Sequence, residues 1–219
     1  MKIALIQDSL LVPAGTERVF KYIIEEFDNA DIFTLAYNEN RTLPEFKLYD
    51  IKVSWANIFI KNHDKFKIFF PIATYIMQYW NFYNYDIIIS SSATTAKYIS
   101  RFTGKHYCFG YYPTRAIWAA DEYFDKRSIK GKVFKFLLPY FKKRDLDASQ
   151  RVYKFIAQSK KSSQAFKEIY NVNAPIINSP IDYDKFKIGI NEPKSDNYLI
   201  VSRLVHWKKI EYAIHAFNE

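Results

Sequence analysis

Residues 86–92 read DIIISSS, and this is the clearest strand signal in the sequence. An unbroken apolar run bounded by polar residues is typical of a strand that is buried on both faces, as strands of parallel sheets are. Similar runs recur along the chain and alternate with segments of helical periodicity. This alternation predicts an α/β fold in which helices cover both faces of a parallel sheet. The other predicted strands are 3–6, 31–36, 45–53, 106–111, 155–157 and 175–178, and the predicted helices are 17–27, 66–83, 131–150 and 159–169. Glu17 opens the first of these helices, Ser159 is predicted to cap the last, and the serines at 90–92 are expected to stand at a helix start that a hydroxyl can cap.

The composition of the 219 residues excludes several classes of protein. With 49% hydrophobic and 25% charged residues, the chain is neither intrinsically disordered nor collagen-like. Its one cysteine, Cys108, excludes a disulfide scaffold and a multi-cysteine zinc site, and we interpret it as a buried strand residue. The longest apolar stretch, residues 68–80, is interrupted by Pro71 and Gln78 and is too short to span a bilayer. The apolar run at the N-terminus, residues 3–6, is too short and too early for a signal peptide, so we expect a cytoplasmic protein.

The C-terminal stretch has the composition of a linker followed by a new unit. Residues 187–197 are polar and contain Gly189 and Pro193, whereas residues 198–201 resemble a strand and residues 208–217 a helix. One strand and one helix cannot enclose a hydrophobic core. We therefore predict one domain over residues 1–190 and an incomplete second domain over residues 191–219, whose remainder lies outside this chain.

The net charge of +9 is concentrated in the middle of the chain. Residues 101–150 contain 11 basic and 5 acidic side chains, and the basic residues of 126–144 alternate with aromatic and aliphatic ones. Such a segment can lie on an anionic membrane surface, contact nucleic acid phosphates, or form a solvated helix face over a packed apolar one. We expect no nucleic acid partner, because the sequence has no zinc-finger, RRM or KH signature.

Several loops at predicted strand ends could bind a ligand, because ligands of open parallel sheets bind at the carboxyl ends of the strands. Gly15 precedes a predicted helix, where a missing Cβ lets backbone N–H groups approach an anion. An ordinary loop glycine remains the alternative, and no dinucleotide-binding G-x-G-x-x-G is present. His106 is interpreted as a strand residue, and no cluster of metal ligands is visible in the sequence.

Arg203 and Lys208 follow the last predicted strand and are five residues apart. A guanidinium offers bidentate contacts and an ammonium a point charge, so the two side chains could bind one diphosphate. They could equally be two solvated cations, since the charge run continues with Lys209.

Six segments, in order along almost the whole chain, resemble motifs of the family-4 retaining glycosyltransferases. The most specific is the last, which resembles the opening of the donor domain of those enzymes. The resemblance implies the GT-B architecture of two Rossmann-like domains facing each other across a cleft. This chain would be the acceptor-side domain and the start of the nucleotide-sugar donor domain. The segments are GTERV at 15–19, YDIIISSS at 85–92, YPTRAIW at 112–118, IAQS at 156–159, NSPIDYDKF at 178–186 and VSRLVHWK at 201–208.

The resemblance also implies an activity and roles for individual residues. Such enzymes transfer a sugar from a nucleotide sugar with retention of anomeric configuration, without a metal or other cofactor. The acceptor would be a glycan or a lipid-linked molecule of surface polysaccharide or glycolipid synthesis. Arg203, Lys208 and Gly15 would hold the donor phosphates, and Tyr111 stands where relatives have a catalytic histidine. The acceptor-site or loop candidates are Thr16, Ser91, Ser92 and Arg115.

Two consequences follow for the isolated chain. Because the segment that holds the sugar and nucleotide in such enzymes lies beyond residue 219, we expect this chain alone to transfer sugar poorly. We also expect residues 126–144 to place the protein at the inner face of the membrane, where a lipid-linked acceptor resides. The alternative function is that of a non-catalytic binding module or partner subunit derived from one half of a transferase.

Overall fold

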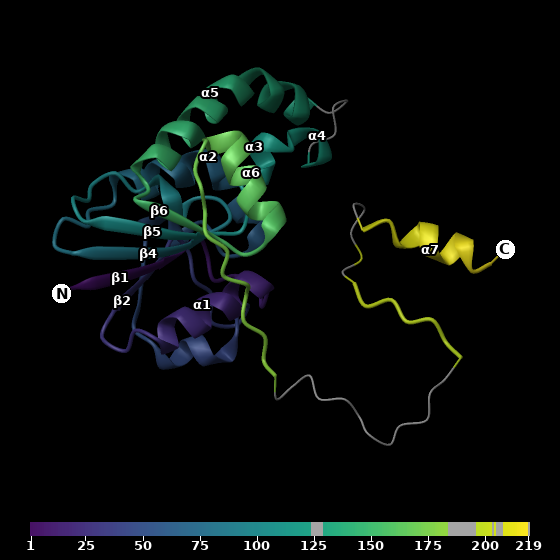
Figure 1. Ribbon diagram of the computed structural model, residues 1–219, viewed down its shortest axis with the longest axis horizontal. Helices are drawn as coiled ribbons and strands as arrows, with labels where there is room; N and C mark the ends of the chain where they lie inside the picture. The colour runs from purple at the N-terminus through teal and green to yellow at the C-terminus, as the bar shows by residue number, and fades with distance from the viewer. Residues whose placement is uncertain (124–128, 184–195, 203, 205–207, 219) are drawn as a thin grey trace. The chain divides into compact units, whose positions relative to one another are not determined.

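The computed structural model describes residues 1–123, 129–183, 196–202, 204 and 208–218 (Figure 1). These residues belong to two compact units, Met1–Pro180 and Ile181–Glu219. The predicted domain boundary at residue 190 lies outside the described residues, so the predicted extents of the two domains stay a prediction.

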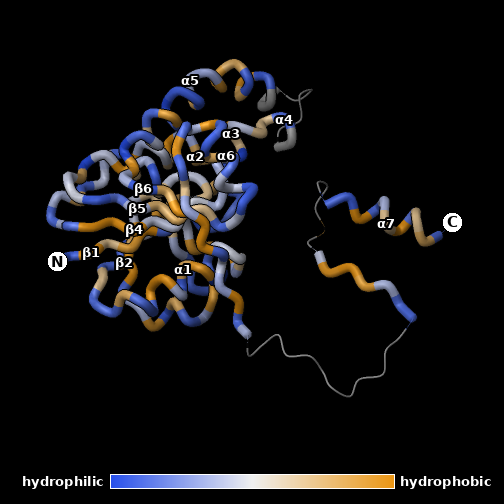
Figure 2. The backbone as a smooth tube through the Cα atoms, viewed as in Figure 1, coloured by the Kyte–Doolittle hydropathy of each residue, from blue (hydrophilic) through white to orange (hydrophobic). Residues whose placement is uncertain are grey.

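The first unit is built on a six-stranded sheet in the order β3-β2-β1-β4-β5-β6, and every pair of neighbouring strands is parallel. The apolar positions of β1 and β4 lie opposite each other, with Leu5 beside Ile89 and Ala4 beside Ile88. Figure 2 shows these hydrophobic strands at the centre of the unit. The strands are β1 (Ile3–Gln7), β2 (Asp31–Thr34), β3 (Ile51–Val53), β4 (Ile87–Ser92), β5 (Lys105–Gly110) and β6 (Lys154–Ala157).

Seven α-helices and three 3₁₀ helices are described in the part of the chain that the structure covers. Ser159 precedes α6 and its hydroxyl accepts a hydrogen bond from the Ser162 amide, so the predicted N-cap is confirmed. The α-helices are α1 (Gly15–Glu25), α2 (His63–Tyr79), α3 (Arg115–Trp118), α4 (Ala120–Tyr123), α5 (Ile129–Arg151), α6 (Lys160–Tyr170) and α7 (Ile210–Ala216); the 3₁₀ helices are η1 (Pro44–Leu48), η2 (Trp55–Ile58) and η3 (Ala96–Tyr98).

Alternate residues of each strand enter two separate cores, because successive side chains of a strand point to opposite faces. Leu5 packs with Phe20 of α1 and Phe46 of η1, whereas Ile6 packs on the opposite face with Met77 of α2. Helix α6 covers β5 and β6, and α1 lies across the sheet from α2, α5 and α6 (Figure 1). The predicted Rossmann-like α/β fold is therefore confirmed.

Two predicted elements differ in the structure for reasons of pairing and local sequence. Residues 45–53 contain η1 and only a three-residue strand, because Pro44 at the first helical position favours a helical turn. Residues 175–178 were expected to be a strand, but they contribute a single bridge from Ile176 to Ala157.

Two sequence interpretations in β5 are confirmed. Cys108 and His106 are both buried in this strand. Burial raises the pKa of the Cys108 thiol to about 12, which leaves it an unreactive core residue.

The second unit contains α7, and its residues 198–202 form neither a helix nor a strand. The predicted strand 198–201 is thus wrong for this structure, because a strand needs a hydrogen-bonded neighbour and no described residue of this unit supplies one. No side chain of α7 is buried, and Tyr198 stacks on Phe217 with ring centroids 4.2 Å apart. Leu199 and Val201 are more than four-fifths exposed.

Candidate functional site

The carboxyl ends of β1, β4 and β5 bring together four of the residues predicted from the sequence. The Tyr111 hydroxyl donates a hydrogen bond to the Thr16 carbonyl oxygen (3.2 Å), next to Gly15 at the start of α1. The same hydroxyl lies 2.8 Å from Ser91 Oγ. Because a carbonyl can only accept and a phenol has one proton, Ser91 donates to Tyr111. These bonds connect the centre of the sheet to the first turn of α1.

Tyr111 itself is buried and remains a neutral phenol. Burial raises the pKa of Tyr111, and the hydrogen bond from Ser91 lowers it by less. Its backbone oxygen is also occupied, since it accepts hydrogen bonds from Gln158 Nε2 (3.2 Å) and Ser162 Oγ (2.7 Å). Tyr111 therefore connects the end of β4, the start of α1 and the residues that follow β6. Its predicted place at the reacting sugar stays a prediction.

Gly15 is the first residue of α1 and faces open space. A Cβ built at this position meets no atom within 4 Å, and neither crowding nor an unusual backbone angle requires glycine here. Ala14 precedes the helix without a side-chain cap. Gly15 is exposed at this helix start, and its predicted phosphate contact stays a prediction.

Glu17 positions the loop that leads into α1. Its carboxylate accepts hydrogen bonds from the amides of Leu11 (2.8 Å) and Val12 (3.0 Å) and from the Thr42 hydroxyl (2.5 Å). Burial raises the pKa of Glu17, while the hydrogen bonds from Thr42, Val12 and Leu11 lower it by less. From its position in the sequence Glu17 is expected only to open the helix, and its contact with Thr42, 25 residues away, has no local sequence signal.

Asp8 fills a second anion-binding position at the same edge. Its Oδ2 accepts hydrogen bonds from the amides of Ala93 (2.6 Å) and Thr94 (2.8 Å), and its Oδ1 accepts from those of Thr95 (2.8 Å) and Ala96 (2.7 Å). Consecutive amides of this kind are a typical cradle for an anion. Here the cradle is occupied by the protein's own carboxylate, so it is closed to a phosphate.

Ser92 belongs to this arrangement, because its hydroxyl donates to Asp8 Oδ1 (3.0 Å). The serines were expected to stand at a helix start and cap it, but they form the end of β4. Asp8, which lies 85 residues from Ala93 in sequence, supplies the cap instead. A capping partner so distant could not be recognised from local spacing.

Asp145 of α5 holds residues 112–118, the turn after β5 together with α3. Asp145 is fully buried and accepts hydrogen bonds from Thr114 Oγ1 (2.9 Å) and Trp118 Nε1 (2.7 Å). Arg115, between them, is exposed, and its guanidinium carbon lies 5.2 Å from the centroid of the Tyr112 ring. Arg115 is therefore exposed to solvent at the start of α3, whose two ends are held by the bonds from Thr114 and Trp118 to Asp145.

Lys97 of η3 completes the centre around Asp145. Its ammonium lies 3.0 Å from Asp145 Oδ1 and donates to Thr114, while Tyr98 (2.8 Å) and Tyr170 donate to the carboxylate. Burial raises the pKa of Asp145, but Lys97 and these hydrogen bonds bring it below the ordinary value. This centre was not predicted from the sequence. The available signal was one acidic residue on the otherwise apolar stripe 138, 141, 145, 148 and 152 of a helix.

The remaining predicted ligand residues belong to the second unit. Lys208 is exposed, and Arg203 lies outside the described residues. Whether the two side chains converge on one diphosphate therefore stays a prediction. No group of three or more His, Cys, Asp or Glu side chains in the described ranges is placed to hold a metal ion.

The geometry of this edge supports ligand binding more than proton transfer. Both carboxylates described there, Asp8 and Glu17, are buried and bonded to backbone amides, so neither is aimed outward as a general base. In the described part of this edge, the buried Gln7 Oε1 and Thr94 Oγ1 have no hydrogen-bond partner. The open helix start at Gly15 and the exposed Arg115 are the groups available to a ligand.

Comparison with known proteins identifies structural neighbours. No protein-family model matches this sequence, and no curated protein is significantly similar to it. The crystal structure of Anabaena HepE in complex with UDP has a similar fold, with a TM-score of 0.52 and 16% sequence identity over 87% of this chain and 47% of HepE. The structure of HepE with UDP and glucose aligns with a TM-score of 0.49 at 18% identity over the same shares. This chain thus spans about half the length of that protein.

Proposed function

We propose that this chain is the acceptor-side half of a retaining GT-B glycosyltransferase, similar to family 4, which transfers a sugar from a nucleotide sugar. The observation that carries the proposal is the convergence of Gly15, Thr16, Ser91 and Tyr111 at the carboxyl edge of a Rossmann-like sheet. Ligands of open parallel sheets bind at this edge. The fold similarity to HepE, whose solved structure contains UDP, is consistent with a nucleotide-sugar donor.

In this proposal the first unit binds and positions the substrates, and negative charge develops on the diphosphate of the donor as it leaves. The bond between the anomeric carbon and the diphosphate oxygen breaks, the acceptor oxygen bonds to the same face of that carbon, and the acceptor's proton passes to the departing phosphate. Cations and helix amides stabilise the negative charge that develops on the diphosphate. Gly15 would supply amides from this unit, and Arg203 and Lys208 would supply the cations.

The acceptor we propose is a glycan or a lipid-linked molecule of surface polysaccharide or glycolipid synthesis, bound near Thr16 and Arg115. The same proposal places the protein at the inner face of a membrane through the basic residues of 126–144. Residues 126–128 of that segment lie outside the described residues. Among the described helices, none combines the length and the hydrophobicity that a membrane span requires.

The proposal is tested with the complete gene product and a panel of nucleotide sugars and acceptors, at Gly15. Gly15→Asp places a carboxylate at a helix start, which the helix dipole favours, so folding is expected to be unaffected. The same carboxylate repels a diphosphate, and we expect kcat/KM to fall by about 100-fold. In Gly15→Ala the added methyl group meets no neighbouring atom, and we expect a smaller fall in kcat/KM. Asn29→Asp, an exposed position in the turn before β2, is the charge-matched control.

Three outcomes decide between the alternatives. Turnover that is lost in Gly15→Asp and kept in Asn29→Asp supports the proposal, whereas equal turnover in both removes Gly15 from the site. Binding of a glycan without turnover of any nucleotide sugar would favour the non-catalytic module. Residues 1–219 alone are expected to show little or no turnover, and a rate equal to that of the complete product would contradict the assignment of a half-enzyme.

A further inference from the structure

Helix α2 is apolar on two opposite faces. Its buried stripe, Phe66, Phe70, Ala73 and Met77, packs on the first unit with the spacing expected for one helix face. A second apolar stripe has the same spacing and lies on the outer side of the helix. A helix of a globular domain ordinarily exposes charged and polar residues there. The outer stripe consists of Ile68, Ile72, Tyr75 and Tyr79, which are 68%, 50%, 38% and 55% exposed.

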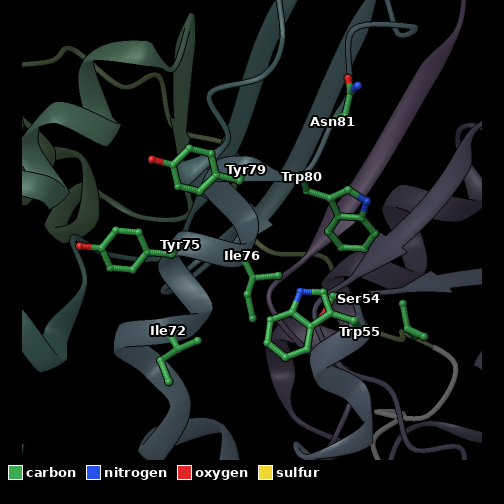
Figure 3. A pocket seen from close by; sticks show the side chains of 9 residues that line it. Ser54, Trp55, Ile72, Tyr75, Ile76, Tyr79, Trp80 and Asn81 are labelled. Carbon is green, nitrogen blue, oxygen red and sulfur yellow. The ribbon is translucent and has the colours of Figure 1, made fainter.

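The segment before α2 extends this apolar surface. Trp55 of η2, Ile58 and Phe59 are each more than half exposed. The Phe59 ring stacks on Phe69 of α2 with centroids 6.3 Å apart. Between η2 and α2 lies a groove of about 520 Å³, and Trp55, Ile72 and Tyr79 are among the residues that line it (Figure 3). The surface is therefore continuous and hollowed, and the protein's own side chains do not fill it.

Helix α5 carries a matching outer stripe. Val133, Phe136, Leu137 and Tyr140 follow the i, i+3, i+4, i+7 spacing of one helix face, and Phe136 is 84% exposed. The two helices meet where the hydroxyls of Tyr75 and Tyr140 form a hydrogen bond. Hydrophobic and hydrophilic positions alternate along α5 in Figure 2. We call the surface formed by residues 55–59 and the two outer stripes the α2–α5 face.

The charges around the α2–α5 face are almost all positive. Residues 55–83 and 132–144 contain eight basic side chains and one acidic one, Asp64, which is paired with Lys67 (3.0 Å). Lys132, Lys135 and Lys143 of α5 are exposed. An apolar surface with aromatic residues and a cationic surround is typical of helices that lie in the headgroup region of an anionic bilayer.

We propose that the α2–α5 face is a docking surface for an anionic lipid bilayer, with Trp55, Ile72 and Phe136 entering the acyl-chain boundary and the lysines contacting lipid phosphates. Charge complementarity favours a bilayer over a second copy of this chain, because a two-fold contact would place two equally cationic surfaces against each other. The membrane contact thus involves α2 and η2 as well as the basic segment of α5 from which it was predicted. The inference deepens the proposed function, since it places the transferase where a lipid-linked acceptor resides.

Co-sedimentation with vesicles tests the proposal without any donor or acceptor, so it can fail while the transferase proposal stands, and the reverse. We expect binding to vesicles of phosphatidylcholine with phosphatidylglycerol, and roughly tenfold less binding to phosphatidylcholine alone. Ile72→Ser with Phe136→Ser is expected to reduce binding by roughly tenfold or more. The matched control, Leu48→Ser with Ile177→Ser, removes two exposed apolar side chains outside the α2–α5 face and is expected to bind normally.

The charge contribution has its own pair of variants. Lys132→Gln, Lys135→Gln and Lys143→Gln together are expected to reduce binding, whereas Lys47→Gln, Lys160→Gln and Lys161→Gln, also exposed, are expected to leave it unchanged. Equal loss in both triple variants would show that only net charge matters and would overturn the proposal. Binding that is indifferent to phosphatidylglycerol would overturn it as well.

A measurement on the unaltered protein guards against variants that fail to fold. Lipids brominated in the acyl chain are expected to quench its tryptophan fluorescence, and Trp55→Phe to lose most of that quenching. Absence of quenching contradicts the proposal. A dimer in lipid-free solution that Ile72→Ser with Phe136→Ser dissociates, together with no vesicle binding, would instead assign the face to a second copy of the chain.

Discussion

Asp8 and Asp145 are two buried carboxylates that contact the same short segment, residues 93–98, in different ways. Asp8 accepts hydrogen bonds from the backbone amides of residues 93–96, whereas Asp145 is held by the side chains of Lys97 and Tyr98. Amides are fixed by the backbone, so the Asp8 contact needs only one loop and one strand end. The Asp145 contact needs side chains from η3, α3 and α6 as well, and it determines where these helices lie.

Of the two carboxylates, Asp8 supports the candidate site and Asp145 supports the fold. Asp8 shapes the loop after β4 at the carboxyl edge, directly beside Ser91 and Tyr111. Asp145 joins α5 to η3, α3 and α6. A buried ion pair contributes little net stability but is strongly destabilising when one partner is lost, whereas a cap contributes a smaller amount on its own.

The largest effect is expected when the Asp145 centre is broken on one side. Asp145→Ala leaves the Lys97 ammonium buried without its counter-charge, and we expect the free energy of unfolding to fall by about 3–5 kcal/mol. Urea denaturation followed by circular dichroism measures this change. Asp145→Leu combined with Lys97→Met removes both charges and is expected to recover much of the loss. A double variant less stable than Asp145→Ala would contradict this account of the centre.

A smaller effect is expected at Asp8. Asp8→Ala removes the acceptor of four amides, and we expect a loss of about 2 kcal/mol in the free energy of unfolding. Amide hydrogen exchange should show faster exchange at residues 93–96 and little change at α5. Asp8→Asn keeps one carbonyl acceptor and is expected to lose less. Faster exchange throughout α5 in Asp8→Ala would mean that the two carboxylates act as one unit.

His106 is buried like the two aspartates, but its side chain is neutral. Burial lowers the pKa of His106 to about 3, and its Nε2 lies 2.8 Å from Ser90 Oγ. A group whose pKa is depressed in the folded state stabilises the fold above its unfolded pKa, about 6.5, and that stability is lost as the pH falls toward 3. We expect a loss of up to about 1.4 kcal/mol for each pH unit below 6.5. Denaturation of His106→Gln between pH 7 and 5 should lack this slope, and an unchanged slope would assign it to other groups.

The sequence predicted the fold where hydrophobic patterns are local. The unbroken run at 87–89 and the alternation of strands and helices were sufficient for the parallel sheet, and Ser159 was correctly predicted as an N-cap. The pattern was misleading at 175–178 and 198–201, because an apolar run becomes a strand only when a neighbouring strand is available.

The candidate site was predicted in part. Gly15, Thr16, Ser91 and Tyr111 were chosen from separate motifs, and the structure places them together. The contacts that hold them could not be predicted, since Asp8 and Asp145 find their partners across tens of residues in sequence. The exposure of the outer stripes of α2 and α5 could not be predicted either, because apolar periodicity alone does not show which of two apolar helix faces is buried.

The order of strands and helices along the chain can be predicted from the sequence, because side-chain periodicity is a property of neighbouring residues. The partner of each buried polar group depends on the tertiary structure. It placed the Asp8 carboxylate against four consecutive backbone amides, and it left open space beside Gly15 at the start of α1. The reason is physical: a buried charge is tolerated only where the whole fold brings partners within hydrogen-bonding distance, and those partners are seldom neighbours in the chain.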